Sequence, residues 1–463
     1  MRELVMAAPQ LVEARDLLTR AYHRSMNFEA CAESARVLLA ISPDHRGGGH
    51  YLAQSLYALG DQEGALATYE GLAAAEATPG ALEGVAALSY RLGRIDAART
   101  AFAAHLTRSR GPGRSPALFG LMRLESDAGD RASAERARKD LAELFHSKPV
   151  GVSSYLTSRL QAYGPPEWFK LVDKGHLAGV VRRGLAAVPG GRAPATFVLP
   201  AERAELLAYA SGAPSRALYI AKPTHGSGGQ GIELAEGAEA FADRAGYVVQ
   251  RYLERPLLAA GHKAHVRAYG LITSTDPLRA YVYGDGLVRL APEAFNLRGL
   301  NRLELAMHVT NTALHAGDPR LVLSDDAEAG DKGHVWSLEA YMRHLHSRDA
   351  KEARRRLGDL MGWFVRALKA DGFFERQAAL GLPGSFGPKL FGLDVVFDAD
   401  ANPWLIEVQA VPGVSGTPLV NRVNSLLHTT LARMMIGEGP PEEVERANAG
   451  AFERLDVVSY PPP

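Results

Sequence analysis

The stretch Phe391–Gln409, F-G-L-D-V-V-F-D-A-D-A-N-P-W-L-I-E-V-Q, decides how the second half of this chain folds. Two apolar runs flank a turn rich in Asp, Asn and Pro, which predicts two antiparallel strands with a short connection. A symmetric turn would place Asp394 directly opposite Glu407, with Gln409 on the same face as Glu407. Facing carboxylates repel each other, and oxygen ligands at this density suit Mg²⁺. We therefore predict a metal site here; the alternative is a surface hairpin with solvated acids.

The composition limits the class of protein. A chain of 463 residues is expected to hold two or three domains. Lys+Arg and Asp+Glu both number 52, so we expect no overall attraction to nucleic acid or to a membrane surface. The single cysteine, Cys31, excludes intramolecular disulfides and indicates a reducing compartment. The start has no apolar core of signal-peptide length and no long apolar run follows, so we expect a soluble, cytoplasmic protein.

The first third of the chain is rich in Ala and Leu and contains a degenerate repeat. Asn27, Gly60, Gly93 and Gly129 each precede an Ala-rich amphipathic stretch, at steps of 33, 33 and 36 residues. A helix, a glycine turn and a second helix resemble the tetratricopeptide pattern, so residues 1–147 are predicted to form all-α helical-hairpin repeats. Such repeats would offer a concave surface that recruits a protein or peptide. The alternative is a helical packing or dimerisation module.

A glycine-rich loop follows a predicted strand in A-L-Y-I-A-K-P-T-H-G-S-G-G-Q-G-I-E-L. A Rossmann site needs a helix after the loop and a P-loop needs a lysine after the glycines, whereas here Lys222 precedes them and I-E-L follows. We predict a strand–loop–strand flap whose backbone N–H groups can approach phosphates, because no side chains obstruct them. An ordinary glycine-rich hairpin is the alternative. The loop glycines are Gly226, Gly228, Gly229 and Gly231.

Basic side chains recur in the next motif, K-A-H-V-R-A-Y. The alternation of a strand would put Lys263, His265, Arg267 and Tyr269 on one face, and the following predicted hairpin ends at Arg289. Each cation alone is typical of a solvated strand. Together with a glycine loop and an acid pair, they predict a site for a nucleoside triphosphate and its metal.

The order of these motifs resembles that of the tubulin-tyrosine ligase-like family. The motifs are K-P-x-x-G-x-x-G-x-G-I, V-V-Q-R-Y-L-E-R-P-L-L, G-H-K-x-x-V-R-A-Y, D-P-L-R-x-Y-x-Y-x-x-G-L-V-R, H-V-T-N and F-G-L-D…W-L-I-E-V-Q. Members of the family are ATP-grasp enzymes that join an amino acid to a protein by an amide bond. The resemblance covers approximately Leu171–Leu431. It implies a multidomain chain with an α+β ATP-grasp domain at 201–436, after a linker and N-terminal subdomain at 148–200 and before a C-terminal tail at 437–463.

The resemblance also implies cofactors, partners and residue roles. ATP and Mg²⁺ would be bound, with a free amino acid and a protein or peptide acceptor as partners. Arg267 and Arg289 would handle the transferred phosphate and the incoming carboxylate, as catalytic residues. Asp394, Glu407 and Gln409 would hold the metal. The residues implied to bind the nucleotide are Lys222, Gly226, Gly228, Gly229, Gly231, Gln250, Arg251, Tyr252, Leu253, Lys263, His265, Thr310 and Asn311.

Some positions depart from the family pattern. His265 stands where the family usually has Asp, Gln409 where it has Asn, and Val309 replaces a leucine after His308. The predicted function is an ATP-dependent carboxylate–amine ligase that modifies a protein or peptide through an acyl phosphate. One alternative is a catalytically impaired scaffold that binds a partner through its repeats. The other is a ligase for small peptides or metabolites.

Overall fold

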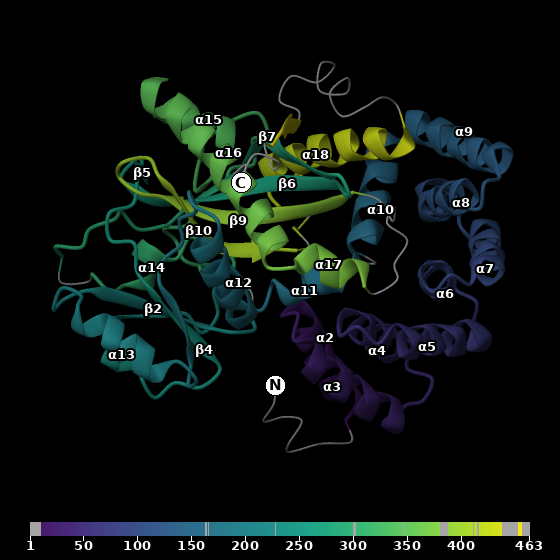
Figure 1. Cartoon of the computed structure of the whole chain (residues 1–463), viewed down its shortest axis with the longest axis horizontal. Helices are drawn as coiled ribbons and strands as arrows, with labels where there is room; N and C mark the ends of the chain where they lie inside the picture. The colour runs from purple at the N-terminus through teal and green to yellow at the C-terminus, as the bar shows by residue number, and fades with distance from the viewer. Residues whose placement is uncertain are drawn as a thin grey trace. The chain divides into compact units, whose positions relative to one another are not determined.

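The structure, a computed structural model, describes residues 11–162, 164, 166–226, 228–299, 302–345, 347–379, 388–410, 412–413, 416–437 and 452–455. Contacts divide the chain into two compact units. The first comprises 1–169, 376–388 and 428–440, and the second comprises 170–375, 389–427 and 441–463. The helices labelled α2 to α9 belong to the first unit, and the strands that carry a label in Figure 1 belong to the second.

Four helical hairpins occupy most of the described part of the first unit. Gly60, Gly93 and Gly129 mark three of the turns with φ of 92°, 73° and 82°, a region open to glycine. Asp61 and Asp130 then cap the helices that follow. The predicted helical-hairpin repeats are confirmed, while their tetratricopeptide character stays a prediction. The hairpins are α2 (Val12–Arg24) with α3 (Phe28–Ile41), α4 (Arg46–Ala58) with α5 (Gln62–Ala75), α6 (Pro79–Arg91) with α7 (Ile95–Arg108), and α8 (Ser115–Asp127) with α9 (Arg131–Ser147).

The helical unit continues beyond these hairpins. α10 packs against α8 and α9. Farther along, the Tyr57 hydroxyl donates a 2.7 Å hydrogen bond to the carbonyl oxygen of Gly164, and the Phe169 ring lies edge-on 5.5 Å from that of Phe28. Buried contacts therefore tie part of the segment assigned to a linker, 148–200, to the hairpins. The additional helices are η1 (Gly111–Arg114), α10 (Pro149–Ala162) and α11 (Glu167–Lys170).

The smaller sheet of the second unit has the antiparallel order β1-β4-β2-β3. Because side chains alternate along a strand, its two faces differ in chemistry. Tyr219, Ala221 and Val249 enter an apolar cluster with α13 and η2. The opposite face carries Lys222 and Gln250. The elements are β1 (Thr196–Leu199), β2 (Leu218–Pro223), β3 (Glu233–Glu236), β4 (Tyr247–Arg251), α13 (Arg203–Ser211) and η2 (Ala238–Phe241).

The larger sheet follows the path β10-β9-β6-β7-β11, with β5 beside β6 and β8 beside β7. The amphipathic helix α16 packs against β7 and β10 and buries Leu360, Met361 and Phe364. The strands are β5 (Leu258–Ala259), β6 (His262–Thr275), β7 (Leu278–Leu290), β8 (Val335–Ser337), β9 (Lys389–Phe397), β10 (Pro403–Gln409) and β11 (Phe452–Arg454). The remaining helices are α12 (Lys174–Ala187), α14 (Leu305–His308), α15 (Leu338–His344), α16 (Ser347–Ala370), α17 (Phe373–Ala378) and α18 (Pro418–Ile436).

The predicted fold class, helical-hairpin repeats followed by an α+β domain, is confirmed. One detail differs. The segment 437–463, expected to be a C-terminal tail outside the folded domain, contributes β11, which pairs antiparallel with β7. A short edge strand of three residues is difficult to recognise because its pairing partner lies far away in sequence. Within the described ranges, no helix has both the length and the apolar character needed to cross a membrane.

Candidate functional site

The β9–β10 hairpin brings the two predicted carboxylates opposite each other. Phe397 pairs with Pro403, so the turn is one residue tighter than the symmetric turn assumed from sequence. A β-bulge just before Glu407 then shifts the register and places Glu407 opposite Asp394. Without the bulge, Ile406 would face Asp394 instead. The expected pairing is therefore present, and it depends on an irregularity that the sequence pattern does not reveal.

Asp394 is buried and is neutralised by Arg267, with His265 close by. Arg267 on β6 donates hydrogen bonds to both carboxylate oxygens, one of them 2.9 Å from Nη2 to Oδ2. Nε2 of His265 lies 3.6 Å from Asp394 Oδ1. Burial alone would raise the pKa of this carboxyl group, but Arg267 and His265 outweigh it and hold the pKa well below its usual range. Asp394 is therefore a carboxylate in this site.

Glu407 is more accessible to solvent than Asp394, and it lies between two nitrogen donors. Its Oε1 accepts a 3.2 Å hydrogen bond from Gln409 Nε2 and lies 3.6 Å from Lys174 Nζ. Among the described residues, no group of three or more His, Cys, Asp and Glu side chains is arranged for a metal. The predicted metal set depends instead on two carboxylates and the Gln409 amide, all on one face of β9 and β10. These are hard oxygen ligands, and this donor set fits Mg²⁺.

Three largely buried cations in the second unit form no ion pair among the described residues, although Asp394 favours the charged forms of Lys222 and Arg289 from a distance. Lys222 Nζ donates a 3.0 Å hydrogen bond to Gln250 Oε1, and burial lowers the pKa of Lys222 to about 8. Lys263 Nζ donates a 2.9 Å hydrogen bond to the Tyr252 hydroxyl, and burial, assisted by Lys222, lowers the pKa of Lys263 to about 7. Burial and then Arg267 lower the pKa of Arg289, which pairs with His265 in the β6–β7 ladder.

The glycine loop connects β2 with β3 and is held on two sides. Gly229 has φ of 81°, and a Cβ there would lie 3.3 Å from Val309 and 3.4 Å from Asn311. The loop therefore rests directly on the segment after α14. On its other side, the carbonyl oxygen of Gly226 accepts a 3.0 Å hydrogen bond from Lys174 Nζ. Gly226, Gly228, Gly229 and Gly231 all have positive φ, as expected for a loop with exposed backbone amides.

The other predicted nucleotide residues divide into two groups. Thr310 joins the site, since its hydroxyl lies 3.1 Å from His265 Nδ1. Asn311 accepts a 3.0 Å hydrogen bond from the Ala313 amide and so shapes its own turn. The Arg251 side chain lies on the opposite face from Gln250, because the two alternate along β4, and it bonds to Leu218 O and Glu254. Leu253 follows in the connection between β4 and β5.

Lys174 is the site residue that sequence reasoning missed. It belongs to the segment 148–200, which was interpreted as a linker and subdomain, and its partner Glu407 is remote in sequence. The sequence does contain a local signal for the helix that begins at Lys174. Asp173 caps α12 by accepting a 2.6 Å hydrogen bond from the His176 amide, so Lys174 is the first residue of that helix. His225 Nε2 also lies 3.2 Å from Asp173 Oδ2, which attaches the glycine loop to the start of α12.

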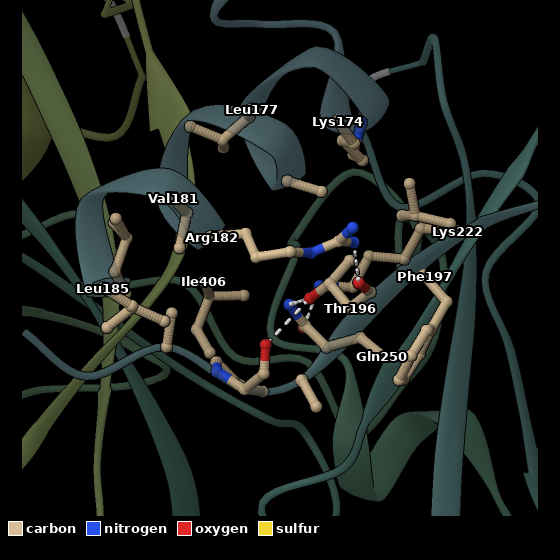
Figure 2. Close-up of a pocket in the computed structure, with 16 residues that line it drawn as sticks. Lys174, Leu177, Val181, Arg182, Leu185, Thr196, Phe197, Lys222, Gln250 and Ile406 are labelled. Atoms are coloured by element: carbon tan, nitrogen blue, oxygen red, sulfur yellow. Dashed lines mark hydrogen bonds between the residues drawn. The ribbon is translucent and has the colours of Figure 1, made fainter. Parts of the chain in front are cut away.

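A pocket of about 200 Å³ adjoins this cluster. Figure 2 shows Leu177, Val181 and Leu185 of α12 on one side and Lys222 with Gln250 on the other. The lining is mainly apolar, with a few polar groups at defined places, as is typical of small-molecule sites. Of the residues implied to bind the nucleotide, Lys222 and Gln250 line this pocket. Space for a bound molecule therefore lies next to Lys222, a buried cation that forms no ion pair in the part of the chain that the structure describes.

The model of the tubulin-tyrosine ligase family matches residues 164–443, and the chain therefore belongs to that family. The expected resemblance is confirmed. Human (Homo sapiens) tubulin polyglutamylase TTLL5 is 33% identical over 225 residues, which cover 48% of this chain and 17% of that protein. Mouse (Mus musculus) tubulin polyglutamylase TTLL6 is 28% identical over 268 residues, 56% of this chain and 32% of that protein.

A nematode relative matches over a similar part of the chain. Tubulin polyglutamylase ttll-4 of Caenorhabditis elegans is 30% identical over 272 residues, which cover 58% of this chain and 42% of that protein. The chain thus spans less than half the length of these curated relatives.

Proposed function

We propose that this protein is an ATP-dependent ligase that joins an amino acid to a protein or peptide acceptor through an acyl phosphate. The observation that carries the proposal is the set of largely buried cations Lys222, Lys263 and Arg289, which form no ion pair among the described residues. Burying an unpaired cation is costly, and perturbed groups of this kind cluster at functional sites. A polyphosphate would neutralise all three.

The proposed roles follow from the neighbours of each group. Lys222 and Lys263 hold the nucleotide, and the glycine loop covers its phosphates with backbone N–H groups. Arg289, which makes no ion pair within the described ranges, receives the transferred phosphoryl group or a substrate carboxylate. Asp394, Glu407 and Gln409 would hold Mg²⁺, which neutralises phosphate charge when bound.

The chemistry explains why no protein nucleophile is needed. A carboxylate oxygen of one substrate attacks the γ-phosphorus of ATP, the bond to the bridging oxygen breaks, and ADP leaves. The amine of the other substrate then attacks the acyl carbon, phosphate departs, and the amine loses a proton as the amide forms. Both steps depend on positioning and charge neutralisation. The cationic site supports this kind of catalysis.

The names of the relatives suggest the substrates. Several are called tubulin polyglutamylases. We therefore propose glutamate as the amino acid and a protein carboxylate as its acceptor, recruited by the helical hairpins. The test combines purified protein, Mg²⁺–ATP, isotope-labelled glutamate and a Glu-rich acceptor peptide. One ADP released for each glutamate found in the peptide by mass spectrometry supports the proposal; no ADP release with any of the amino acids Glu, Gly or Tyr contradicts it.

A scaffold without ligase activity is the second candidate, and one observation favours it. Both oxygens of Asp394 are engaged by Arg267, and His265 lies 3.6 Å away where the family usually has an acid. Such an arrangement leaves less capacity for a metal. Calorimetry separates the two functions, because a scaffold binds ATP weakly and without dependence on Mg²⁺. A gain of Mg²⁺-dependent binding in His265→Asp would support the scaffold.

A further inference from the structure

A buried chain of hydrogen bonds leads away from Lys263 to a histidine. Lys263 Nζ lies 2.9 Å from the Tyr252 hydroxyl, and that hydroxyl lies 2.8 Å from His308 Nδ1. His308 Nε2 lies 2.7 Å from the carbonyl oxygen of Arg302. The Lys263 ammonium group also sits 4.4 Å from the centre of the Tyr252 ring. All four residues belong to the second unit.

The direction of each hydrogen bond in this chain follows from the carbonyl oxygen of Arg302 at its end. A carbonyl oxygen can only accept, so His308 Nε2 carries the hydrogen that it donates to Arg302 O. Burial lowers the pKa of His308 to about 4, so the ring is neutral and Nδ1 has a free lone pair. Tyr252 therefore donates to His308, and its oxygen is left to accept from Lys263. The chain has one consistent orientation.

His308 does not reach a ligand itself. Its side chain is 2% exposed and packs edge-on against the rings of Tyr252 and Phe295. Two residues later, Thr310 contacts His265 at 3.1 Å. The segment 308–310 thus supports two side chains on the same face of β6. It reaches Lys263 through Tyr252, and it contacts His265 directly.

We infer that His308 is a positioning residue for the nucleotide: through Tyr252 it fixes the place and direction of Lys263 Nζ. The inference rests on the proposed function, because Lys263 is assigned there to the nucleotide. A long lysine side chain loses much rotamer freedom when it is held in one place. The Tyr252 oxygen, itself oriented by His308, holds the amine in that place before the nucleotide arrives, which is preorganisation.

The test measures the Kd of Mg²⁺–ATP by calorimetry on full-length variants. Tyr252→Phe removes a single oxygen atom, and His308→Leu removes the acceptor that orients it. Each is expected to weaken binding roughly five- to tenfold, the scale of one ordinary hydrogen bond. The double variant is expected to bind no more weakly than either single variant, because both changes break the same chain.

Two further variants distinguish the positioning of Lys263 from a general loosening of the segment around His308. His315 is also buried, and its Nε2 bonds to the carbonyl oxygen of Val309 at 2.7 Å, so His315→Leu perturbs the same segment without touching the chain to Lys263. Its Kd is expected to stay within twofold of wild type. His308→Asn keeps an acceptor near the position of Nδ1 and is expected to recover part of the lost affinity.

The dependence of ATP affinity on pH gives a readout that a purely structural role of His308 would not change. The titratable groups facing Lys263 are Lys222, Tyr252 and His308. Affinity for ATP should fall as rising pH removes the Lys263 proton, and an accepting oxygen favours the charged amine. In Tyr252→Phe and His308→Leu that fall is expected at lower pH than in wild type; in His315→Leu it is expected to be unmoved.

Unchanged affinity in folded Tyr252→Phe and His308→Leu would overturn this inference while leaving the proposed function intact. Additive losses in the double variant, or an equal loss in His315→Leu, would also overturn it. Absence of ATP binding by the wild-type chain would overturn the proposed function and this inference together.

Discussion

The two units of the chain bury charged side chains in different ways. In the helical unit, Glu83 is buried but lies 3.4 Å from Arg159 Nε. Glu125, also buried, accepts hydrogen bonds of 2.7 and 3.0 Å from Arg99. These charges have partners within the fold, and they need no ligand to explain them.

The α+β unit contains the opposite arrangement. Lys222 and Lys263 are buried, Arg289 is largely buried, and none forms an ion pair within the described ranges. Their lowered pKa values record the cost of this burial. The presence or absence of an ion-pair partner thus distinguishes charges that stabilise the fold from charges that bind a ligand. Removing a charge that is held by short hydrogen bonds, as Glu125 is, should weaken the fold, whereas removing a buried cation that forms no ion pair within the described ranges should weaken ligand binding and strengthen the fold.

The largest effect is expected from Glu407→Gln. The variant keeps the shape of the side chain but removes the charge proposed to hold Mg²⁺, so ADP release should fall by roughly a thousandfold. Asp400→Asn, in the exposed turn of the same hairpin, is the matched control and should retain wild-type turnover. Equal rates for wild type and Glu407→Gln would remove this residue from the site.

Lys222→Met should separate binding from stability. Loss of the cation should weaken ATP binding by about a hundredfold, while the free energy of unfolding at pH 7 rises by roughly 1–3 kcal/mol, since an unpaired buried charge is removed. Calorimetry and chemical denaturation measure the two effects. Glu125→Gln, in the helical unit, should do the reverse, lowering stability and leaving the ATP affinity unchanged.

The same variant has a pH signature. Lys222 loses its proton near pH 8 in the folded protein and near 10.5 when unfolded, so the unfolded state binds more protons in that window. Wild-type stability should therefore rise relative to Lys222→Met as pH increases from about 8 to 10.5. A parallel pH dependence in the two proteins would show that Lys222 is not perturbed by burial.

Glu83 should show the opposite pH trend. Burial raises its pKa to about 7, so between about pH 4.5 and 7 the folded state binds more protons than the unfolded state. Stability in wild type should fall through that window by roughly 2–3 kcal/mol relative to Glu83→Gln. Urea denaturation at several pH values measures the difference. A constant difference across the window would contradict the assignment.

The smallest effect is expected at the glycine loop. Gly229→Ala adds a Cβ only 3.3 Å from Val309 at a φ of 81°, whereas Gly228→Ala meets no atom closer than 3.9 Å at a similar φ of 76°. The first should weaken ATP binding about tenfold and the second only a few-fold, because both are strained but only one is crowded. Equal losses would mean that the contact with Val309 does not matter.

Local patterns in the sequence were sufficient for part of the site. The apolar–acidic alternation of the β9–β10 hairpin and the basic alternation of β6 were readable because strand periodicity is local. Alternation also indicates that Arg251 and Gln250 face opposite sides of β4, whereas the resemblance implied that both bind the nucleotide. The bulge that aligns Glu407 with Asp394 was not readable, since it shows only in the pairing register.

The contacts that sequence reasoning missed join distant segments. Lys174 approaches Glu407 across the fold, and His308 reaches Lys263 only through Tyr252. Neither relation has a local periodic signal. The engagement of Asp394 by Arg267 was hidden for the same reason, because Arg267 was assigned to substrate rather than to the neighbouring strand.

We propose that the buried cations Lys222, Lys263 and Arg289 of the α+β unit form a polyphosphate site. The most direct measurement is calorimetric titration of the purified full chain with ATP, with and without Mg²⁺, for wild type and Lys222→Met. We predict saturable binding to wild type that strengthens with Mg²⁺ and is about a hundredfold weaker in Lys222→Met. Binding that is absent, or that is insensitive to both Mg²⁺ and the loss of Lys222, would contradict the claim.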